Sequence, residues 1–292
     1  MNPYDILKSA QAGKYAIGSF NFSTAEILKA IVLAAQELKS PIIVSTSEGE
    51  ADFIGMQEAA ALVGAWRKET GLPIILNLDH GKSLEEVKKA VEAGYDAAHF
   101  DGSGLSYDEN ITQTKAVVEF VREFEKNFNK KIIVEGELGY LRGSSSIHEE
   151  KLEIKPEDLT SPEQANDFLG QTGVDSLAVV IGNAHGVFLQ SEEKLDLERL
   201  AKIRETIGER AFLVLHGGSG ILEQDVKRAI ELGIVKVNVN TELRAAYKGG
   251  LDRELQEKPQ ETTPYKILEP SIEAVKGVMK KKIHLFGSAG KV

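Results

Sequence analysis

The chain has 292 residues, 42% of them hydrophobic and 27% charged, so it can bury a substantial core. Its formal net charge of -10 argues against a nucleic-acid groove and against an anionic membrane surface as partner. The absence of cysteine excludes disulfides and thiolate metal ligands, and it fits a cytoplasmic protein. The first residues lack the features of a signal peptide, and no apolar run reaches the about 18 residues of a membrane span.

Short β-rich runs alternate with amphipathic helical patterns along most of the chain. Ser83–Ala93 is one such helical segment, with its apolar residues on one face at helical spacing. Gly94, Gly173 and Gly233 predict helix ends, where a left-handed residue is needed. The eight predicted strands lie near Ala16–Phe20, Ile42–Thr46, Ile74–Leu78, Ala97–Asp101, Ile132–Glu135, Ser176–Ile181, Phe212–Leu215 and Val235–Val239.

Eight strands alternating with helices predict a closed parallel barrel, the (β/α)8 TIM barrel, as a single domain over residues 1–292. The alternative is an open, doubly wound sheet. Leu138–Thr160 is long and polar, as active-site lids often are. The tail from Gln256 onward has a helical pattern over Ser271–Lys282, which we expect to pack outside the barrel or on a partner subunit.

Three of the predicted strands are followed by a histidine: His80 after the third, His185 after the sixth and His216 after the seventh. The carboxyl ends of barrel strands meet at one rim, where active sites of this fold lie. Three neutral imidazoles there suit Zn2+ with one position left open for a substrate. His99, inside the fourth strand, and His284, in the tail, are expected to be structural.

The same rim carries further polar groups. The glycine-rich run from Gly217 to Gly220 and the turn at Asn240-Thr241 can direct backbone N–H groups at an anion. Loops after strands seven and eight are the usual phosphate site of this fold. Asp101 either caps a turn or contributes to a second metal position, and the sequence pattern leaves both readings open.

The motifs at the ends of the predicted strands resemble those of the class II, metal-dependent ketose-bisphosphate aldolases. This is the family of fructose- and tagatose-bisphosphate aldolases. The likeness runs over nearly the whole chain, from about Ala16 to Lys291. Its motifs are Asp79-His80-Gly81, Phe100-Asp101-Gly102-Ser103, Glu135-Gly136-Glu137-Leu138-Gly139, Ile181-Gly182-Asn183-Ala184-His185-Gly186, His216-Gly217-Gly218-Ser219-Gly220 and Asn238-Val239-Asn240-Thr241.

The resemblance implies a role for each group. His80, His185 and His216 would bind the catalytic Zn2+, while Asp101 and Glu137 would belong to an alternative or second divalent metal position. Asp79 would be the catalytic acid/base, and Asn238 would donate a hydrogen bond to the enediolate. A monovalent cation would lie near the phosphate. The candidate substrate-binding residues are Asn21, Ser47, Gly186, Gly217, Gly218, Ser219, Asn238, Val239, Asn240 and Thr241.

Two segments depart from the family pattern. Serines, Ser144 and Ser145, stand where the family usually has an acidic pair that moves a proton. The candidates for that catalytic step are therefore the later residues His148, Glu149 and Glu150. Thr263-Pro264-Tyr265 replaces the usual Asp-Pro-Arg segment, so contact with a distal phosphate would fall to Arg142, Arg244 or Lys248, or else the aldehyde partner differs.

The expected function is that of a zinc-dependent aldehyde-lyase of carbohydrate metabolism and glycolysis. It would cleave a ketose 1,6-bisphosphate, fructose 1,6-bisphosphate first, to dihydroxyacetone phosphate and glyceraldehyde 3-phosphate. Cleavage beside a ketone leaves a carbanion, for which Zn2+ is an electron sink that makes a Schiff-base lysine unnecessary. The resemblance also implies a homo-oligomer, a dimer or tetramer. The alternatives are an aldolase for tagatose bisphosphate or another phosphorylated sugar, and a catalytically weak sugar-phosphate-binding protein.

Overall fold

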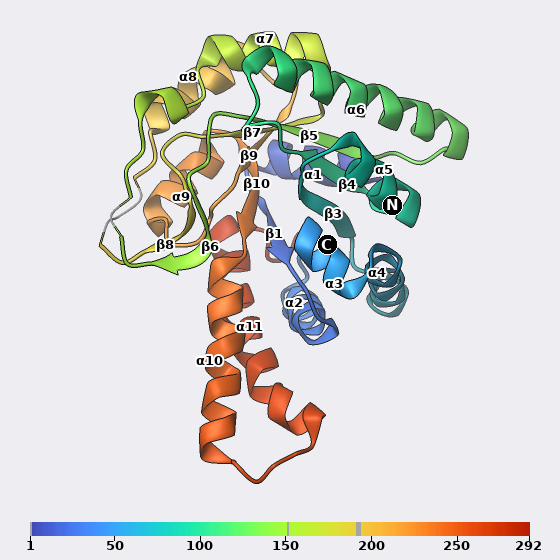
Figure 1. The fold of residues 1–292 in the computed structure, drawn as a ribbon, viewed down its shortest axis with the longest axis vertical. Helices are drawn as coiled ribbons and strands as arrows, with labels where there is room; N and C mark the ends of the chain where they lie inside the picture. Colours follow the sequence, from blue (N-terminus) through green and yellow to red (C-terminus); the bar gives the residue numbers. More distant parts are fainter. Residues whose placement is uncertain (1, 151, 191–193) are drawn as a thin grey trace.

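Eight parallel strands close into a barrel in a computed structural model that describes residues 2–150, 152–190 and 194–292 (Figure 1). Around the barrel the strand order is β1-β10-β9-β7-β5-β4-β3-β2, which confirms the (β/α)8 fold and excludes an open doubly wound sheet. Each predicted strand is present. Their bounds are Ile17–Asn21 (β1), Ile42–Ser47 (β2), Ile74–Gly81 (β3), Ala97–Phe100 (β4), Ile133–Leu138 (β5), Ser176–Val179 (β7), Phe212–Leu215 (β9) and Ile234–Val239 (β10).

The helices begin and end where local signals place them. Ser83, for example, accepts the Glu86 N–H at the start of α5, and Gly94 ends that helix with φ of 109°. Gly173 caps α7 in the same way, and Gly233 lies two residues beyond the end of α9, also with positive φ. The helices up to β10 are Pro3–Gly13 (α1), Ala25–Leu38 (α2), Glu48–Ile54 (α3), Met56–Thr70 (α4), Leu84–Ala93 (α5), Tyr107–Phe128 (α6), Pro162–Thr172 (α7), Leu197–Ile207 (α8) and Glu223–Glu231 (α9).

The last two helices form a hairpin that projects beyond the barrel (Figure 1). They are α10, Thr241–Glu257, and α11, Pro264–Phe286, which packs against α10 and α2. The predicted Ser271–Lys282 helix is correct in position but too short, because Pro264 opens the helix at a position where proline fits and α11 continues through Pro270. Within the described part of the chain, no helix is both long and apolar enough to cross a bilayer.

The predicted lid segment Leu138–Thr160 contains regular structure. Gly143–His148 forms β6, which pairs in parallel with β8, His185–Phe188, and a 3-10 turn, η1, covers Pro156–Asp158. Residue 151 of this segment lies outside the described residues. Since β8 begins at His185, this small sheet lies directly beside the expected metal site.

The strands change from apolar to polar along their inward-facing positions. Residues two apart on a strand share a face, and from β1 to β5 the first such residue of each strand belongs to a small apolar cluster closed by α1. The next two inward-facing residues of each strand are polar, and all of them are buried except the half-buried Ser47. The barrel interior is therefore apolar at the amino ends of these strands and polar at their carboxyl ends. The series are Ile17-Ser19-Asn21, Ile43-Ser45-Ser47, Ile75-Asn77-Asp79, Ala97-His99-Asp101 and Ile133-Glu135-Glu137.

Candidate active site and metal centre

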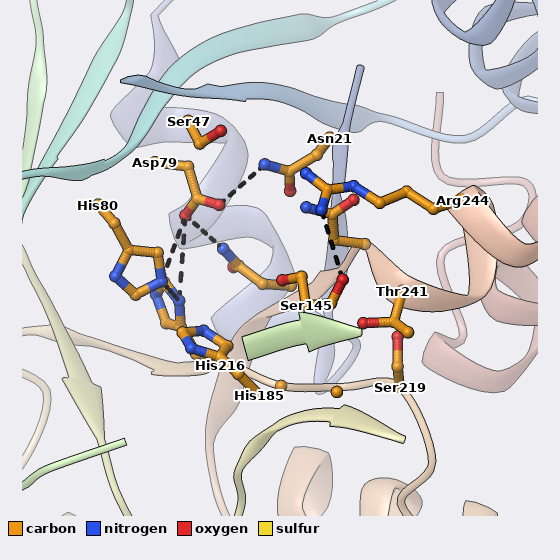
Figure 2. A pocket seen from close by; sticks show the side chains of 14 residues that line it. Asn21, Ser47, Asp79, His80, Ser145, His185, His216, Ser219, Thr241 and Arg244 are labelled. Carbon is orange, nitrogen blue, oxygen red and sulfur yellow. Dashed lines mark hydrogen bonds and ion pairs between the residues drawn. The ribbon is translucent and has the colours of Figure 1, made fainter. Parts of the chain in front are cut away.

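A cavity opens at the carboxyl ends of the barrel strands, and most of the predicted site residues line it (Figure 2). The three histidines gather on one side of it in this view, with Asp79 next to them. The lining residues are Asn21, Ser47, Asp79, His80, Ser145, His185, Gly186, His216, Gly217, Ser219, Asn238, Asn240, Thr241 and Arg244.

Two of the histidines face each other through ring nitrogens. His80 Nε2 lies 3.0 Å from His216 Nδ1. The remaining nitrogens each meet a carboxylate at 2.8 Å: His80 Nδ1 meets Asp101 Oδ2, and His216 Nε2 meets Glu135 Oε1. A neutral ring that donates to a carboxylate through one nitrogen presents a lone pair on the other. Two lone pairs therefore converge on one point, the arrangement expected of metal ligands.

His185 lies at the edge of this pair. Its ring centroid is 4.8 Å from that of His80 and 6.4 Å from that of His216. Burial, with His80 and His216 nearby, lowers the pKa of His185 to about 3. Burial also lowers the pKa of His216. Both rings are thus neutral at pH 7 and need not lose a proton to bind a cation.

A second group of potential ligands, His80, Asp101 and Glu137, shares His80 with the first. His80 Nδ1 is 2.8 Å from Asp101 Oδ2 and 3.6 Å from Glu137 Oε2. Burial would raise the pKa of Asp101, but His80, His99 and Lys82 outweigh it and hold it far below its usual value. Both Glu137 oxygens are buried without a well-aligned hydrogen bond among the described residues. Such orphaned oxygens are costly to bury and suit a cation.

Asp79 is held from both sides. Its Oδ2 accepts from Asn21 Nδ2 at 3.0 Å (Figure 2). Its Oδ1 accepts from Asn238 Nδ2 at 2.9 Å. Burial would raise the pKa of Asp79, but the neighbouring His80, His99, His216 and Lys236 outweigh burial and hold it well below its usual value. The carboxylate is therefore ionised, oriented and next to the facing histidines.

Sequence reasoning missed two interior residues of this site. Lys236 Nζ lies 2.7 Å from Glu135 Oε2, so a buried lysine supports the carboxylate that contacts His216. His99, expected to be purely structural, lies among the site carboxylates, with its Nε2 3.1 Å from Glu137 Oε2. A lysine inside an apolar strand, and a histidine two residues before Asp101 on the same face, were the available signals.

The glycine-rich loop after β9 is only partly free to meet an anion. Gly217 has φ of 67°, and a Cβ there would lie 1.9 Å from the Ala184 carbonyl oxygen, so only glycine fits. The Gly218 N–H donates to the Asn238 carbonyl at 2.7 Å. Of the predicted phosphate-binding residues, Ser219 and Thr241 line the cavity, whereas Gly218 and Val239 do not.

Arg244 is the one arginine among the cavity-lining residues of the described chain. It lies 2.7 Å from Glu50 Oε1 and donates to the Ser145 carbonyl at 3.4 Å. Arg142 is instead held by both oxygens of Asp158. Lys248 is 79% exposed and pairs weakly with Asp252 at 3.7 Å.

A second hollow of about 540 Å³ adjoins the cavity and shares Ser47 and Arg244 with it. Its other walls include Phe53 and Tyr247. Arg244 therefore lies at the passage between the cavity and this second hollow.

The candidate proton-transfer residues lie beside the cavity. The ring of His148 stacks on Phe188, with centroids 4.6 Å apart, and its Nε2 is 2.9 Å from the Ser144 carbonyl oxygen. Ser145 lines the cavity, while His148 and Glu149 do not. For either residue to reach a bound substrate, β6 would have to move.

The chain is similar to a family and to three solved structures that are described as aldolases. A family model described as fructose-bisphosphate aldolase class-II matches residues 1–291. The YdjI aldolase from Escherichia coli K12 is 34% identical, with a TM-score of 0.83 over 99% of this chain and 97% of that chain. A putative fructose-1,6-biphosphate aldolase from Coccidioides immitis is 26% identical, with a TM-score of 0.85 over 99% and 97% of the two chains. Fructose-bisphosphate aldolase from Campylobacter jejuni, at 20% identity and a TM-score of 0.81 over 99% and 95%, supports the fold alone.

Proposed function

The chain belongs to the class II fructose-bisphosphate aldolase family, and from that premise we propose that it is a zinc-dependent aldehyde-lyase. In this proposal it cleaves fructose 1,6-bisphosphate reversibly to dihydroxyacetone phosphate and glyceraldehyde 3-phosphate. The observation that carries the proposal is the pair of facing nitrogens, His80 Nε2 and His216 Nδ1, each backed by a carboxylate. This donor set fits Zn2+, which favours imidazole ligands oriented by outer carboxylates.

We propose that His80, His185 and His216 hold the Zn2+, with Asp101 and Glu137 forming a second divalent position. When bound, the metal supplies a Lewis acid that stabilises negative charge on the substrate oxygens. The protein's part is to keep the imidazoles neutral and oriented. Asp101 orients His80 through Nδ1, and the low pKa of His185 keeps that ring neutral at pH 7.

Asp79 is the proposed acid/base of the carbon–carbon step. Because it is ionised and fixed by Asn21 and Asn238, it can take the proton of the C4 hydroxyl as the bond to C3 breaks. In the reverse direction it returns that proton to the new hydroxyl. We propose that Asn238 then donates to the enediolate oxygen of the dihydroxyacetone half, in place of its bond to Asp79.

The two phosphates would lie at opposite ends of the substrate. Gly186, Gly217, Ser219 and Thr241 line one part of the cavity and are proposed to hold the phosphate of the dihydroxyacetone half. Arg244, at the passage to the second hollow, is proposed to contact the distal phosphate.

The test is a coupled cleavage assay with fructose and tagatose 1,6-bisphosphates as separate substrates. Faster turnover of fructose 1,6-bisphosphate supports the proposal, and faster turnover of the tagatose compound would reassign the C4 stereochemistry. Tight binding of dihydroxyacetone phosphate without cleavage of either sugar would instead support a sugar-phosphate-binding protein.

A further inference from the structure

The third barrel strand is irregular at the proposed metal site. In the pairing of β3 with β4, the register shifts by one residue between Leu78 and Gly81, which is the mark of a β-bulge. The extra residue lies within Asp79-His80, opposite His99. His80 itself has φ of 56°, in the left-handed region that non-glycine residues seldom adopt.

The bulge allows two consecutive side chains to face the same cavity. In a regular strand, Asp79 and His80 would point to opposite sides of the sheet. Here both line the cavity, one as the proposed acid/base and the other as a proposed metal ligand. Bulges beside active sites re-aim side chains in this way. The position of His80 therefore depends on whatever holds the bulge in place.

His99 holds the bulge through a hydrogen bond to the backbone. Its Nδ1 accepts the His80 N–H at 3.2 Å. Its Nε2 lies 3.1 Å from Glu137 Oε2 on the next strand, β5. The ring is 0% exposed, so water cannot replace it as the acceptor. A side chain thus satisfies an amide that the bulge leaves without its regular partner.

We propose that His99 is a positioning residue that keeps His80 in its left-handed conformation and thereby sets the metal affinity of the site. The inference rests on the proposed metal-dependent function. Asp101 fixes the same residue through its side chain, by the contact with His80 Nδ1. Backbone and ring of His80 are then both constrained, and Nε2 is left facing the cavity.

A doubly protonated His99 is the competing arrangement. Burial lowers the pKa of this ring, but Asp79, Glu137 and Glu135 outweigh burial and raise it, which favours the charged form. The geometric evidence for the neutral form is the His80 N–H, which is directed at Nδ1. A charged ring would carry a hydrogen on Nδ1 and could not accept the His80 N–H. The acceptor role requires a neutral ring with its hydrogen on Nε2, directed at Glu137.

His99→Asn and His99→Leu form a matched pair of variants, because the two side chains have nearly the same shape and only Asn can accept the His80 N–H. The metal-stripped proteins are titrated with Zn2+ and with Co2+ against a competing chelator, and the visible spectrum of the Co2+ form is recorded. We expect His99→Leu to weaken metal binding about 10–100-fold, the usual effect of losing an outer-shell partner, and to alter the Co2+ spectrum. His99→Asn should stay close to the parent, as should the control His284→Leu, on an exposed position of α11.

Equal affinities and spectra in the parent, the Leu variant and the Asn variant would overturn the inference while leaving the metal site intact. Should His99→Leu fail to fold, nitrogen NMR of the histidine-labelled parent decides, with the Asn variant assigning the His99 signals. We expect an unprotonated Nδ1 and a protonated Nε2 in His99. A hydrogen on Nδ1 would refute the acceptor role. A parent protein that binds neither metal would overturn the proposed function and, with it, this inference.

Discussion

Lys236 Nζ lies 2.7 Å from Glu135 Oε2 inside the barrel, and both side chains are at most 3% exposed. Burial would raise the pKa of Glu135, but Lys236, His216 and His99 outweigh it and hold the pKa far below its usual value. Two buried charges thus depend on each other. The same carboxylate contacts His216 through Oε1, which links the stability of the barrel interior to the proposed metal site.

Lys236→Met should be strongly destabilising, because it leaves the Glu135 charge buried without its partner. Breaking one side of a buried ion pair typically costs about 3–5 kcal/mol in the free energy of unfolding. The measurement is equilibrium denaturation of the metal-free protein. The double variant Lys236→Met/Glu135→Gln should recover much of the loss, and the surface control Lys248→Met should stay within about 0.5 kcal/mol of the parent. A single variant as stable as the control would show that the pair is not coupled.

Asp79→Asn should keep the metal and dihydroxyacetone phosphate binding but lose cleavage. The amide can still accept and donate hydrogen bonds near Asn21 and Asn238, yet it cannot take a proton. General acid–base groups are worth about 10²–10⁴-fold in rate, so kcat should fall by that factor. Steady-state kinetics with parallel metal analysis checks this. A near-parental kcat would remove Asp79 from the mechanism.

Arg244→Met should separate the two halves of the substrate. Hydrogen bonds to charged groups contribute about 1.5–3 kcal/mol, so kcat/KM for the bisphosphate should fall about 10–150-fold. Binding of dihydroxyacetone phosphate alone should change much less, since Arg244 lies at the passage to the second hollow, on the side proposed for the distal phosphate. Lys248→Met, outside the cavity, is the matched control. An equal loss of affinity for both ligands would place Arg244 at the other phosphate or in a purely structural role.

The proton exchange step should depend on the β6 segment. Replacing His148 and Glu149 together with Ala should slow solvent exchange of the pro-chiral hydrogen of dihydroxyacetone phosphate more than it slows ligand binding. His148 must leave its stack on Phe188 to act, so Phe188→Leu should change the exchange rate as well. Exchange followed by NMR in deuterated solvent gives the rates. Unchanged exchange in the Ala variant would mean that the base lies elsewhere or that solvent carries the proton.

The barrel and its rim were predictable because both follow from local pattern and topology. In the sequence, buried parallel strands appear as short apolar runs, and several of the helices between them end at a glycine. Once the barrel is assumed, residues after the strands share one rim, which places His80, His185 and His216 together. The motifs of the resemblance then supply roles that spacing alone does not.

The supporting residues were harder to find because their roles depend on long-range contacts. His99 lies in an apolar-looking run, and only its position opposite the bulge in β3 shows its bond to the His80 backbone. Lys236 and Glu135 are 101 residues apart in sequence, and Arg244 and Glu50 are 194 apart. The pairing of β6 with β8 likewise joins a polar segment to a strand of four residues, and neither was predicted as a strand.

The most direct test of the metal-dependent aldolase is the cleavage of fructose 1,6-bisphosphate by protein stripped of metal, with elemental analysis of the same sample. The account predicts no cleavage without metal, recovery on adding Zn2+ or Co2+, and no covalent adduct when borohydride is added with substrate. Loss of recovery in His216→Ala, with the fold intact by circular dichroism, would tie the effect to the proposed centre. Full cleavage in a sample shown to be metal-free, or a borohydride-trapped adduct, would contradict the central claim.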